Sequence, residues 1–370
     1  MKKALVSVIN DLVTDQRVHR TCLTLAEEGY VVTLVGRELK NSPPLPQRAY
    51  AMHRFRMIFQ KGPLFYLFFQ VRLFFFLMNR KADLYYSNDL DTLLPNYFLA
   101  KWKGIRLIYD SHEIFPEVPE LKPGSFKKKI WEGLERRLFP RLKTVITVNQ
   151  SIAGYYSEKY GNKVHVIRNL PSKADLVPEA YPVPEAGENK VLILQGSGIN
   201  VDRGGEELVS AMPFVSGANL WIVGGGDAIP VMKTMVENLK LNQKVFFFPR
   251  VSPQNLAFIT ARADIGVTLD KDTNLNYRLS LPNKIFDYFR AGIAVLGSRL
   301  PEIDLLFAKY KPGLQVEKHT PEEIASVINR MISDPAQLET WKKNASLASE
   351  VLNWEMEKPL LQKIIRNENS

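Results

Sequence analysis

A phosphate-binding helix start is the clearest sign of chemistry in this sequence. Residues 280–292 read SLPNKIFDYFRAG and predict a helix whose first turn holds Ser280, Pro282 and Asn283. Ser and Asn satisfy unpaired amides at a helix start, and Pro lacks the N–H that would stay unpaired there. Lys284 adds a full positive charge to a helix end that already carries roughly half a charge and several free N–H groups. The combination predicts a seat for a phosphate group.

Asp287 lies one turn further along the same face of this helix. A carboxylate there can accept hydrogen bonds from ribose hydroxyls while phosphates bind at the helix start, which predicts a nucleotide site. The alternative is a surface ladder of ion pairs among Lys284, Asp287 and Arg290, a common arrangement on an exposed helix. The helix by itself leaves both interpretations open.

A glycine-rich loop supplies a second candidate cation. Residues 196–205 read GSGINVDRGG between a predicted strand and a predicted helix. Glycines such as Gly196 and Gly198 let the backbone approach a ligand closely, and the guanidinium of Arg203 can grip phosphate oxygens at two points. The alternative is an ordinary tight turn, because the loop lacks the lysine and hydroxyl of a P-loop. Arg203 and Lys284 both follow strands of the same predicted domain, and together they can neutralise a diphosphate without a metal ion.

His112 is the candidate for hydrogen bonding or proton transfer at a sugar hydroxyl. It lies in the segment YDSHEIF, directly after a predicted strand. A histidine there can donate to or accept from a hydroxyl, or move a proton near neutral pH. Glu113 and Asp89 are the nearest acidic candidates for a base. The alternative is a cap formed by Asp110 and Ser111 beside a purely structural histidine.

Length and cysteine content narrow the class of protein. A chain of 370 residues with 45% hydrophobic content exceeds the usual size of one core, so two folded domains are expected. The single Cys22 excludes an internal disulfide and fits a reducing compartment. The short apolar run after the first residues predicts a strand and not a signal peptide. We therefore expect a cytoplasmic protein.

The excess positive charge lies in the first half of the chain. Residues 1–170 hold 27 Lys and Arg against 15 Asp and Glu, whereas the remaining residues hold 22 against 24. A basic half attracts a phosphorylated substrate, an anionic membrane surface or nucleic acid. No helix-turn-helix, zinc or base-stacking motif accompanies the charge, so nucleic acid is not expected as a partner.

Short apolar strands alternate with longer helical patterns along the chain, which is typical of parallel sheets. The alternation runs through residues 1–170, stops in a Pro- and Glu-rich stretch at 171–188 and restarts over 189–339. The predicted fold class is therefore α/β, with two Rossmann-like doubly wound parallel-sheet domains joined by a linker. A helical segment at 340–370 is expected to pack back toward the N-terminal domain. Because ligands of such sheets bind beyond the carboxyl ends of the strands, we expect the two domains to face each other across a cleft.

Residues 58–78 form the most hydrophobic stretch of the chain, IFQKGPLFYLFFQVRLFFFLM. Its apolar part is too short to span a bilayer comfortably and contains Gln70 and Arg72. Two interpretations stay open, a helix packed among elements of its domain and a helix that lies in the membrane interface. Aromatic residues flanked by cations are the composition expected for the second. The flanking cations are Arg54, Arg56, Lys61, Arg80 and Lys81.

Together these segments resemble the GT-B glycosyltransferases of glycosyltransferase family 4 over nearly the whole chain. Residues 280–292 and the strand after them look like the donor-binding segment of that family. Asp287 falls at the second glutamate of the family's Glu-x7-Glu motif, which binds ribose, and Leu279 falls at the first. Residues 10–17, with the helix and strand that follow, are similar to the family's opening strand-loop-helix unit.

With this resemblance the candidate residues fall into two sets. The donor-nucleotide set is Gly196, Gly198, Arg203, Arg250, Val251, Asn283, Lys284 and Asp287, and the acceptor or sugar set is Asp15, Arg17, Asp89, His112 and Glu113. By the resemblance, Arg203 and Lys284 match the pair that stabilises the leaving diphosphate. His112 matches the histidine that faces the donor sugar and the acceptor. These three are the expected catalytic residues.

The resemblance implies transfer of a hexose or hexosamine from a nucleoside-diphosphate sugar to a glycan or lipid-linked acceptor. It further implies retention of configuration, with the nucleotide sugar as co-substrate and no metal ion or other cofactor. The expected setting is cell-surface polysaccharide synthesis, in the cytoplasm or peripherally on the inner face of the plasma membrane. A nucleotide-sugar epimerase or hydrolase of the same architecture, or a non-catalytic nucleotide-sugar-binding protein, is the alternative.

Overall fold

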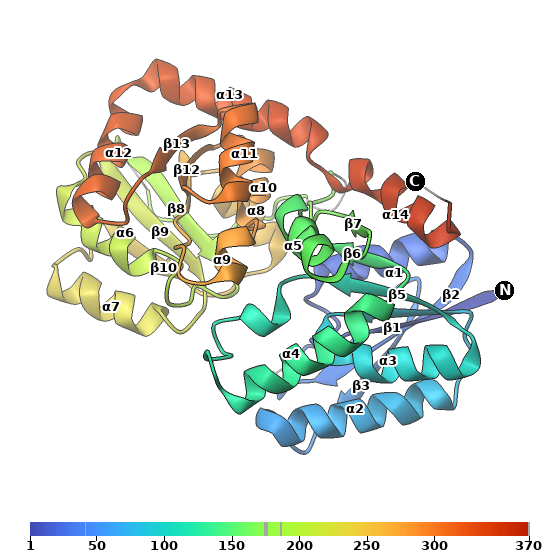
Figure 1. The fold of residues 1–370 in the computed structure, drawn as a ribbon. Coiled ribbons are helices and arrows are strands. Elements are labelled where there is room, and N and C mark those ends of the chain that lie inside the picture. Colours follow the sequence, from blue (N-terminus) through green and yellow to red (C-terminus); the bar gives the residue numbers. More distant parts are fainter. Residues whose placement is uncertain (41, 174–176, 186, 369–370) are drawn as a thin grey trace. The chain divides into compact units, whose positions relative to one another are not determined.

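The computed structural model describes residues 1–40, 42–173, 177–185 and 187–368, and these divide into two compact units (Figure 1). Unit 1 comprises residues 1–169 and the described residues from 357 onward. Unit 2 comprises the described residues between 170 and 356. Each unit is built around one parallel sheet covered by helices, so the predicted pair of Rossmann-like α/β domains is confirmed.

The sheet of unit 1 has, within the described residues, seven parallel strands in the order β3-β2-β1-β4-β5-β6-β7. The strands are β1 (Lys2–Ser7), β2 (Tyr30–Glu38), β3 (Ala51–Arg56), β4 (Leu84–Asn88), β5 (Arg106–Ser111), β6 (Val145–Thr147) and β7 (Val164–Val166). Strand β3 is the exception to the series of apolar strands along this part of the sequence. That strand lies at the edge of the sheet and buries only Phe55, so it lacks the apolar run that marks a central strand.

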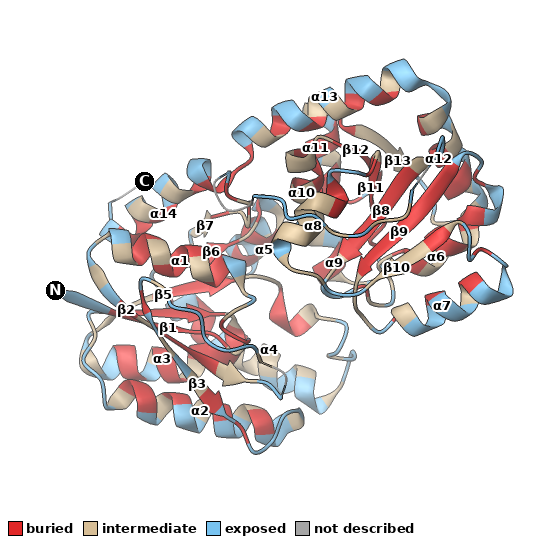
Figure 2. Cartoon of the chain, turned by 180° about the vertical axis from the view of Figure 1, so that it is seen from behind, coloured by how far each residue is buried: buried red, intermediate tan, exposed pale blue. Residues whose placement is uncertain are grey.

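Helices cover both faces of this sheet, with α1 on one face and α2 and α3 on the other (Figure 2). The helices of unit 1 are α1 (Gln16–Glu27), α2 (Gly62–Met78), α3 (Leu90–Lys103), α4 (Phe126–Leu138), α5 (Gln150–Tyr160) and most of α14 (Trp354–Arg366), with single 3₁₀ turns η1 (Phe115–Glu117) and η2 (Phe139–Arg141). The central strands β4 and β5 are buried over most of their length. Strands that are apolar on both faces are expected where helices cover both sides of a parallel sheet.

The sheet of unit 2 has, within the described residues, six parallel strands in the order β10-β9-β8-β11-β12-β13. They are β8 (Lys190–Gly196), β9 (Ala218–Gly224), β10 (Val245–Phe248), β11 (Ile265–Thr268), β12 (Ala294–Ser298) and β13 (Gly313–Val316). The helices are α6 (Gly205–Ala211), α7 (Ile229–Asn238), α8 (Pro253–Thr260), α9 (Leu275–Leu279), α10 (Lys284–Ala291), α11 (Pro301–Tyr310), α12 (Pro321–Ser333) and α13 (Pro335–Val351), with the 3₁₀ turn η3 (Met212–Phe214).

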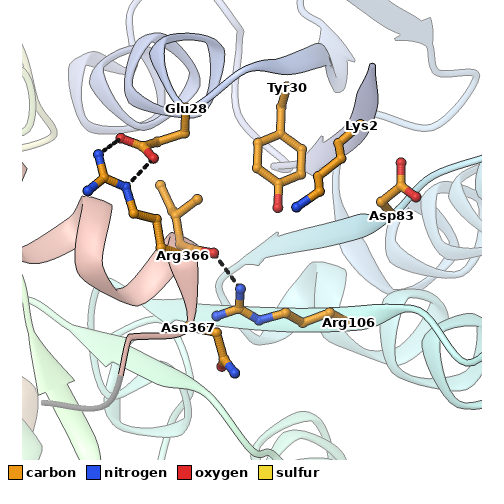
Figure 3. Close-up of a pocket in the computed structure, with 8 residues that line it drawn as sticks. Lys2, Glu28, Tyr30, Asp83, Arg106, Arg366 and Asn367 are labelled. Atoms are coloured by element: carbon orange, nitrogen blue, oxygen red, sulfur yellow. Dashed lines mark hydrogen bonds and ion pairs between the residues drawn. The ribbon is translucent and has the colours of Figure 1, made fainter.

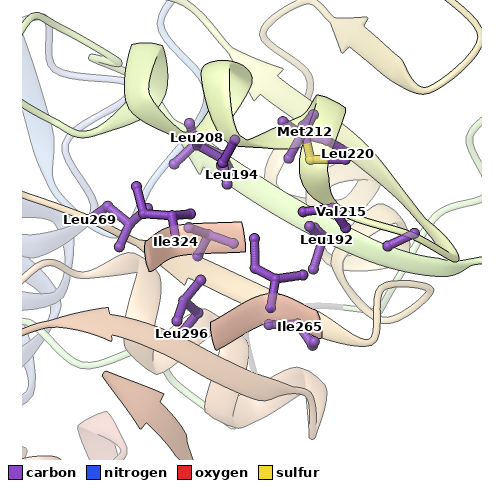
Figure 4. Close-up of a cluster of buried hydrophobic side chains, with 14 of the residues drawn as sticks. Leu192, Leu194, Leu208, Met212, Val215, Leu220, Ile265, Leu269, Leu296 and Ile324 are labelled. Carbon is purple, nitrogen blue, oxygen red and sulfur yellow. The ribbon is translucent and has the colours of Figure 1, made fainter. Parts of the chain in front are cut away.

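Apolar side chains on one face of the second sheet form a continuous core with the helices above it (Figure 4). Leu192 and Leu194 of β8 pack in one cluster with Leu208 of α6 and Ile324 of α12. Each of these four side chains is fully buried. Burial of a leucine or isoleucine side chain contributes roughly 1.5–3 kcal/mol, so this cluster anchors the strand whose carboxyl end leads into the glycine-rich loop.

The C-terminal segment predicted as one helix over 340–370 is two helices, and residues 369–370 lie outside the described chain. Helix α13 packs on α10 and β12 within unit 2. A break follows, at which Asn353 Oδ1 accepts a hydrogen bond from the backbone N–H of Met356. Helix α14 begins directly after this break, and its residues from 357 onward belong to unit 1. The local cap at Asn353 explains why the helical pattern does not continue as one rod.

Two ion-pair and capping contacts fasten the end of α14 within unit 1 (Figure 3). Arg366 forms a two-point ion pair with Glu28, at 2.6 and 2.8 Å. The guanidinium of Arg106 donates to the carbonyls of Ile364 and Ile365 at 2.5 Å, which satisfies free carbonyls at the helix C-terminus. These contacts explain why the last helix groups with unit 1.

The predicted linker at 171–188 has neither helix nor strand in its described part, and its residues 174–176 and 186 lie outside the description. Tyr181 and Val183 pack against the second core cluster of unit 2. The backbone N–H of Glu179 donates to the carbonyl of Gln254 at 3.3 Å. The described part of this segment therefore lies on unit 2 as an extended strap.

Gly224 ends β9 and lies opposite Gly196, the last residue of the neighbouring strand β8. Its φ is +132°, and a Cβ atom there would lie 1.9 Å from the carbonyl oxygen of Gly196. Gly224→Ala should therefore lower the free energy of unfolding by roughly 2 kcal/mol or more, because both the backbone and the contact are strained. Gly217→Ala is the matched control, since Gly217 also has a positive φ but has open space around its Cβ position. Equal losses for the two variants in chemical denaturation would contradict this account.

Candidate active site

The donor-side candidates of unit 2 gather at the carboxyl ends of β8, β9, β10 and β11. Because parallel strands end at the same edge, the loops that follow them are brought together. The carbonyl of Gly225, after β9, accepts a hydrogen bond of 2.7 Å from Ile199 in the loop after β8. Arg250, after β10, donates from Nη2 to the carbonyl of Ser197 at 2.6 Å. The glycine-rich loop after β8 is therefore bonded to the segments that follow β9 and β10.

Arg203 and Lys284 converge on one buried carboxylate, Asp270, which follows β11. Arg203 Nη1 lies 2.5 Å from Asp270 Oδ1, and Lys284 Nζ lies 3.6 Å from Oδ2. The Asp270 side chain is fully buried, whereas Arg203 and Lys284 keep 27% and 14% of their side chains exposed. Arg203 and Lys284 are expected to meet at a phosphate, and the structure places them on opposite oxygens of the same carboxylate.

Gly204 makes this arrangement possible. Its φ is +74°, and a Cβ atom there would lie 2.3 Å from the carbonyl oxygen of Leu269. A glycine is therefore required for the loop to pass beside the end of β11. The guanidinium of Arg203 also lies 4.1 Å from the ring centroid of Tyr277, and this stacking fixes its plane. Its Nε atom is buried and finds no hydrogen-bond partner among the described residues.

The charges at Asp270 shift the pKa values of both partners. Burial would raise the pKa of Asp270, but attraction to Lys284 and Arg203 outweighs it and holds the pKa below the ordinary 3.8. Burial lowers the pKa of Lys284 below its ordinary 10.5, and the neighbouring Arg203 lowers it further while Asp270 opposes the shift. The lysine thus depends on its carboxylate partner to stay charged in a desolvated position.

The phosphate-seat helix starts later than predicted. Helix α10 begins at Lys284, and Ser280 is instead the C-cap of the short helix α9, its hydroxyl donating to the carbonyl of Tyr277 at 3.0 Å. Asn283 is exposed at the N-cap position, in a helical conformation, and makes no side-chain capping bond within the described chain. Capping preferences are local, so they did not reveal that a preceding helix uses Ser280.

Two side chains hold Asp287 directly, and a third residue supports one of them. Gln195 Nε2, at the end of β8, donates to Asp287 Oδ2 at 3.2 Å, and Arg290 Nη2 lies 3.4 Å from Oδ1. Thr260 of α8 in turn contacts Gln195 Oε1 at 2.7 Å. The predicted ladder is thus half present, because Asp287 pairs with Arg290 while Lys284 turns to Asp270. The carboxylate is fixed in orientation and partly exposed.

The remaining donor candidates lie at or just after the ends of β8 and β10. Gly196 ends β8 and Gly198 lies in the loop after it. Val251, the residue after Arg250, is partly buried and packs against the second core cluster of unit 2. The side chain of Arg250 is exposed and contacts the glycine-rich loop through Ser197.

In unit 1, His112 lies between two carboxylates. Its Nδ1 is 3.1 Å from Asp89 Oδ2, and its Nε2 is 3.6 Å from Asp110 Oδ2. The backbone N–H of His112 also donates to Asp89 Oδ1 at 2.8 Å. Asp89 adopts a φ of +58°, an unusual conformation for a residue other than glycine. About 18% of the imidazole side chain is exposed.

The two carboxylates around His112 favour the protonated form of its ring. Burial would lower its pKa, but attraction to Asp89 and Asp110 outweighs burial and raises the pKa well above the ordinary 6.5. The ring is therefore a hydrogen-bond donor and not a base that accepts a proton. Nε2 is buried and faces Asp110 Oδ2, so the exposed part of the imidazole lies elsewhere on the ring.

Arg17 is buried in an ion pair, whereas a residue that binds an acceptor is expected to be exposed. It is 4% exposed and forms a two-point ion pair with Asp110, at 2.7 and 3.1 Å. Its Nη1 also donates to the carbonyl of Ile167 at 2.7 Å. Asp15 is the N-cap of α1 and accepts a hydrogen bond from the backbone of Val18. Both residues position the start of α1, and neither side chain is freely presented.

Glu113 directly follows His112, and its backbone carbonyl accepts hydrogen bonds from Ser111 and Tyr156, at 2.8 and 3.2 Å. These bonds fix the turn that carries His112. The structure gives Glu113 a role in shaping this turn.

Asp110, Asp270 and Gln195 are the residues whose roles the sequence analysis missed. Each directly follows or ends a predicted strand, so their positions marked them as candidates. Their types did not distinguish them from ordinary loop residues. No group of three or more His, Cys, Asp or Glu side chains with metal-binding geometry occurs in the described residues.

Helix α2 has apolar side chains on both faces. Phe65, Phe69, Leu73, Phe76 and Leu77 are buried against the sheet of unit 1. The opposite face leaves Leu64, Leu67, Phe68, Val71 and Phe75 between 40% and 58% exposed. Among the helices of the described chain, none is both long enough and apolar enough to cross a membrane. The segment is therefore core on one side and an uncovered apolar surface on the other.

Comparison with known protein families identifies the class of protein to which this architecture belongs. Residues 15–170 match the family model described as Glycosyltransferase Family 4, and residues 182–347 match the one described as Glycosyl transferases group 1. Two Rossmann-like units with these matches define a glycosyltransferase of the GT-B fold. The chain belongs to the family 4 type of these enzymes, as its sequence resemblance indicates. A sequence comparison with curated proteins finds no match.

Solved structures support the fold along the whole chain. Sucrose-phosphate synthase from Thermosynechococcus elongatus is 18% identical with a TM-score of 0.82, covering 99% of each chain. HepE from Anabaena, in complex with UDP and glucose, is 16% identical with a TM-score of 0.75, covering 99% of this chain and 100% of its own. WaaG, a glycosyltransferase involved in lipopolysaccharide biosynthesis, is 14% identical with a TM-score of 0.66, covering 98% and 99%.

The environment of His112 predicts a measurable protonation state. Its pKa is raised in the folded state, so its stabilising contribution is complete below about pH 6.5 and is lost as the pH rises through the folded value. An NMR titration should find the His112 ring still protonated at pH 7.5. His53 serves as the internal control, because burial and the nearby Arg80 and Arg72 lower its pKa. Asp89→Asn should move the His112 transition to lower pH, and an unchanged transition would contradict the assignment.

Proposed function

We propose that this glycosyltransferase transfers a hexose or hexosamine from a nucleoside-diphosphate sugar to a glycan or lipid-linked acceptor, with retention of configuration. The observation that carries the proposal is the pair of partly exposed cations, Arg203 and Lys284, held together at the strand ends of unit 2. Departure of a diphosphate leaves negative charge on its oxygens, and preorganised cations stabilise that charge as it develops.

The residues supply this charge without a metal ion in the proposed reaction. Arg203 offers a planar guanidinium on a partly exposed side chain, and Lys284 offers an ammonium at the first turn of α10. The free N–H groups of that turn favour the same anion. Asp287, held by Gln195 and Arg290, is the proposed acceptor for ribose hydroxyls.

His112 is the proposed sugar-side residue. As an imidazolium whose side chain is about 18% exposed, it places positive charge near the reacting sugar. Its raised pKa disfavours a role as the general base. The phosphate oxygens of the departing diphosphate are the proposed acceptors of the acceptor's proton.

The proposed setting is synthesis of a cell-surface polysaccharide at the inner face of the plasma membrane. The neighbour HepE is described in complexes with UDP and with UDP-glucose. The neighbour WaaG is described as involved in lipopolysaccharide biosynthesis. A lipid-linked acceptor lies at a membrane, and the uncovered face of α2 is apolar with Lys61 exposed beside it. An anionic bilayer matches the basic character of the first half of the chain.

A donor screen followed by kinetics tests the transfer reaction. UDP, GDP and ADP sugars are compared by thermal shift, and the best donor is then used in a transfer assay. Arg203→Ala and Lys284→Ala should each lower kcat/KM by roughly 30- to 1000-fold, the equivalent of about 2–4 kcal/mol. Arg278→Ala is the control, because Arg278 is an exposed cation of the same region, paired with Asp272.

Two outcomes would replace the proposal with its alternatives. Release of free sugar or of an isomerised nucleotide sugar, without an acceptor product, would indicate a hydrolase or an epimerase. Tight donor binding without turnover for a broad set of acceptors would indicate a non-catalytic binding protein.

The uncovered face of α2 predicts binding to anionic vesicles. Replacing Leu67, Val71 and Phe75 with Ser should reduce co-flotation with phosphatidylglycerol vesicles by at least about tenfold, since each of these side chains contributes roughly 1 kcal/mol on partial burial. The melting temperature should change little, because these residues do not contribute to the core. Phe69→Ser is the control for the opposite face and should unfold the unit. Undiminished flotation of the triple variant would refute the membrane surface.

A further inference from the structure

One carboxylate, Asp270, connects the two cations on which the proposed function rests. Arg203 comes from the loop after β8 and Lys284 from the first turn of α10, so no local geometry fixes their separation. Both contact Asp270, on opposite oxygens. Thr268 Oγ1 donates to Asp270 Oδ2 at 3.1 Å and fixes the orientation of the carboxylate.

Burial separates the roles of the three groups. Asp270 has no exposed surface, so an anionic ligand cannot touch it. The two cations keep exposed edges, through which they can reach a ligand. With Asp270 ionised the three side chains carry a net charge of +1, and a diphosphate brings at least two negative charges at neutral pH. The cluster thus stays attractive to the ligand while the cations are prevented from repelling each other.

We propose that Asp270 is a positioning residue that holds Arg203 and Lys284 together, ready for the diphosphate before it binds. Two like charges in a partly desolvated site repel, and Lys284 would move or lose its proton without a carboxylate beside it. Preorganised charges stabilise a transition state because they need not be rearranged during the reaction. Asp270 acts through the two cations and does not itself contact the reacting atoms.

The test uses inorganic pyrophosphate, which binds the phosphate seat without a base or a sugar. Asp270→Asn should weaken pyrophosphate binding by at least about tenfold and lower kcat for sugar transfer by at least as much, while KM for the acceptor stays unchanged. Asp272→Asn is the matched control, since it removes the same charge from an exposed residue of the same loop. It should leave both measurements unchanged.

A milder variant guards against loss of folding. Thr268→Val removes the hydrogen bond that orients Asp270 and should act in the same direction with a smaller effect. In a double-mutant cycle, Asp270→Asn should cost less in a Lys284→Met background than in the wild type, because part of its effect acts through Lys284. A role only in folding would give independent, multiplying losses.

The outcomes separate this inference from the proposed function. If wild-type protein does not bind pyrophosphate, the phosphate seat is wrong and the inference falls with it. If Arg203→Ala and Lys284→Ala abolish binding while Asp270→Asn leaves it unchanged, only the inference is wrong. Tighter pyrophosphate binding by Asp270→Asn would also overturn it, since the carboxylate would then merely oppose the ligand.

Discussion

A buried carboxylate neutralised by two cations lies at the carboxyl end of the sheet in each unit, and the surrounding loops depend on it. In unit 1, Asp110 contacts Arg17 and His112. In unit 2, Asp270 contacts Arg203 and Lys284. Removing one partner of a buried pair costs about 3–5 kcal/mol, because the other charge is left without compensation. Each carboxylate therefore fixes the position of the chain segments that carry its cations.

The two clusters differ in what they leave exposed. Arg17 and Asp110 are closed off from solvent, so this pair serves as a rigid support and His112 keeps the open edge. At Asp270 both cations keep exposed surface. The same electrostatic arrangement thus presents one charged donor in unit 1 and two in unit 2. Transfer chemistry that relies on stabilising a leaving group needs such fixed charge more than it needs a nucleophile.

Helix α2 shows how one sequence segment serves two environments. Its inner aromatic residues fill the core of unit 1, and its outer apolar residues have no cover within the described chain. A helix that is apolar on every face is normally buried on every face. We propose an anionic bilayer as the cover of this face, and the basic first half of the chain supports the same proposal.

The sequence by itself determined the alternation of strands and helices, the separation into two sheets and the cations at strand ends. These follow from local periodicity and from the rule that parallel strands end at one edge. Only the tertiary structure decided which charges meet, because Arg17 pairs with Asp110 across 93 positions and Arg203 with Asp270 across 67. It also decided that Ser280 ends one helix while α10 begins at Lys284. Pairing of distant residues depends on the packing of loops in space, and residue types and spacing carry little information about it.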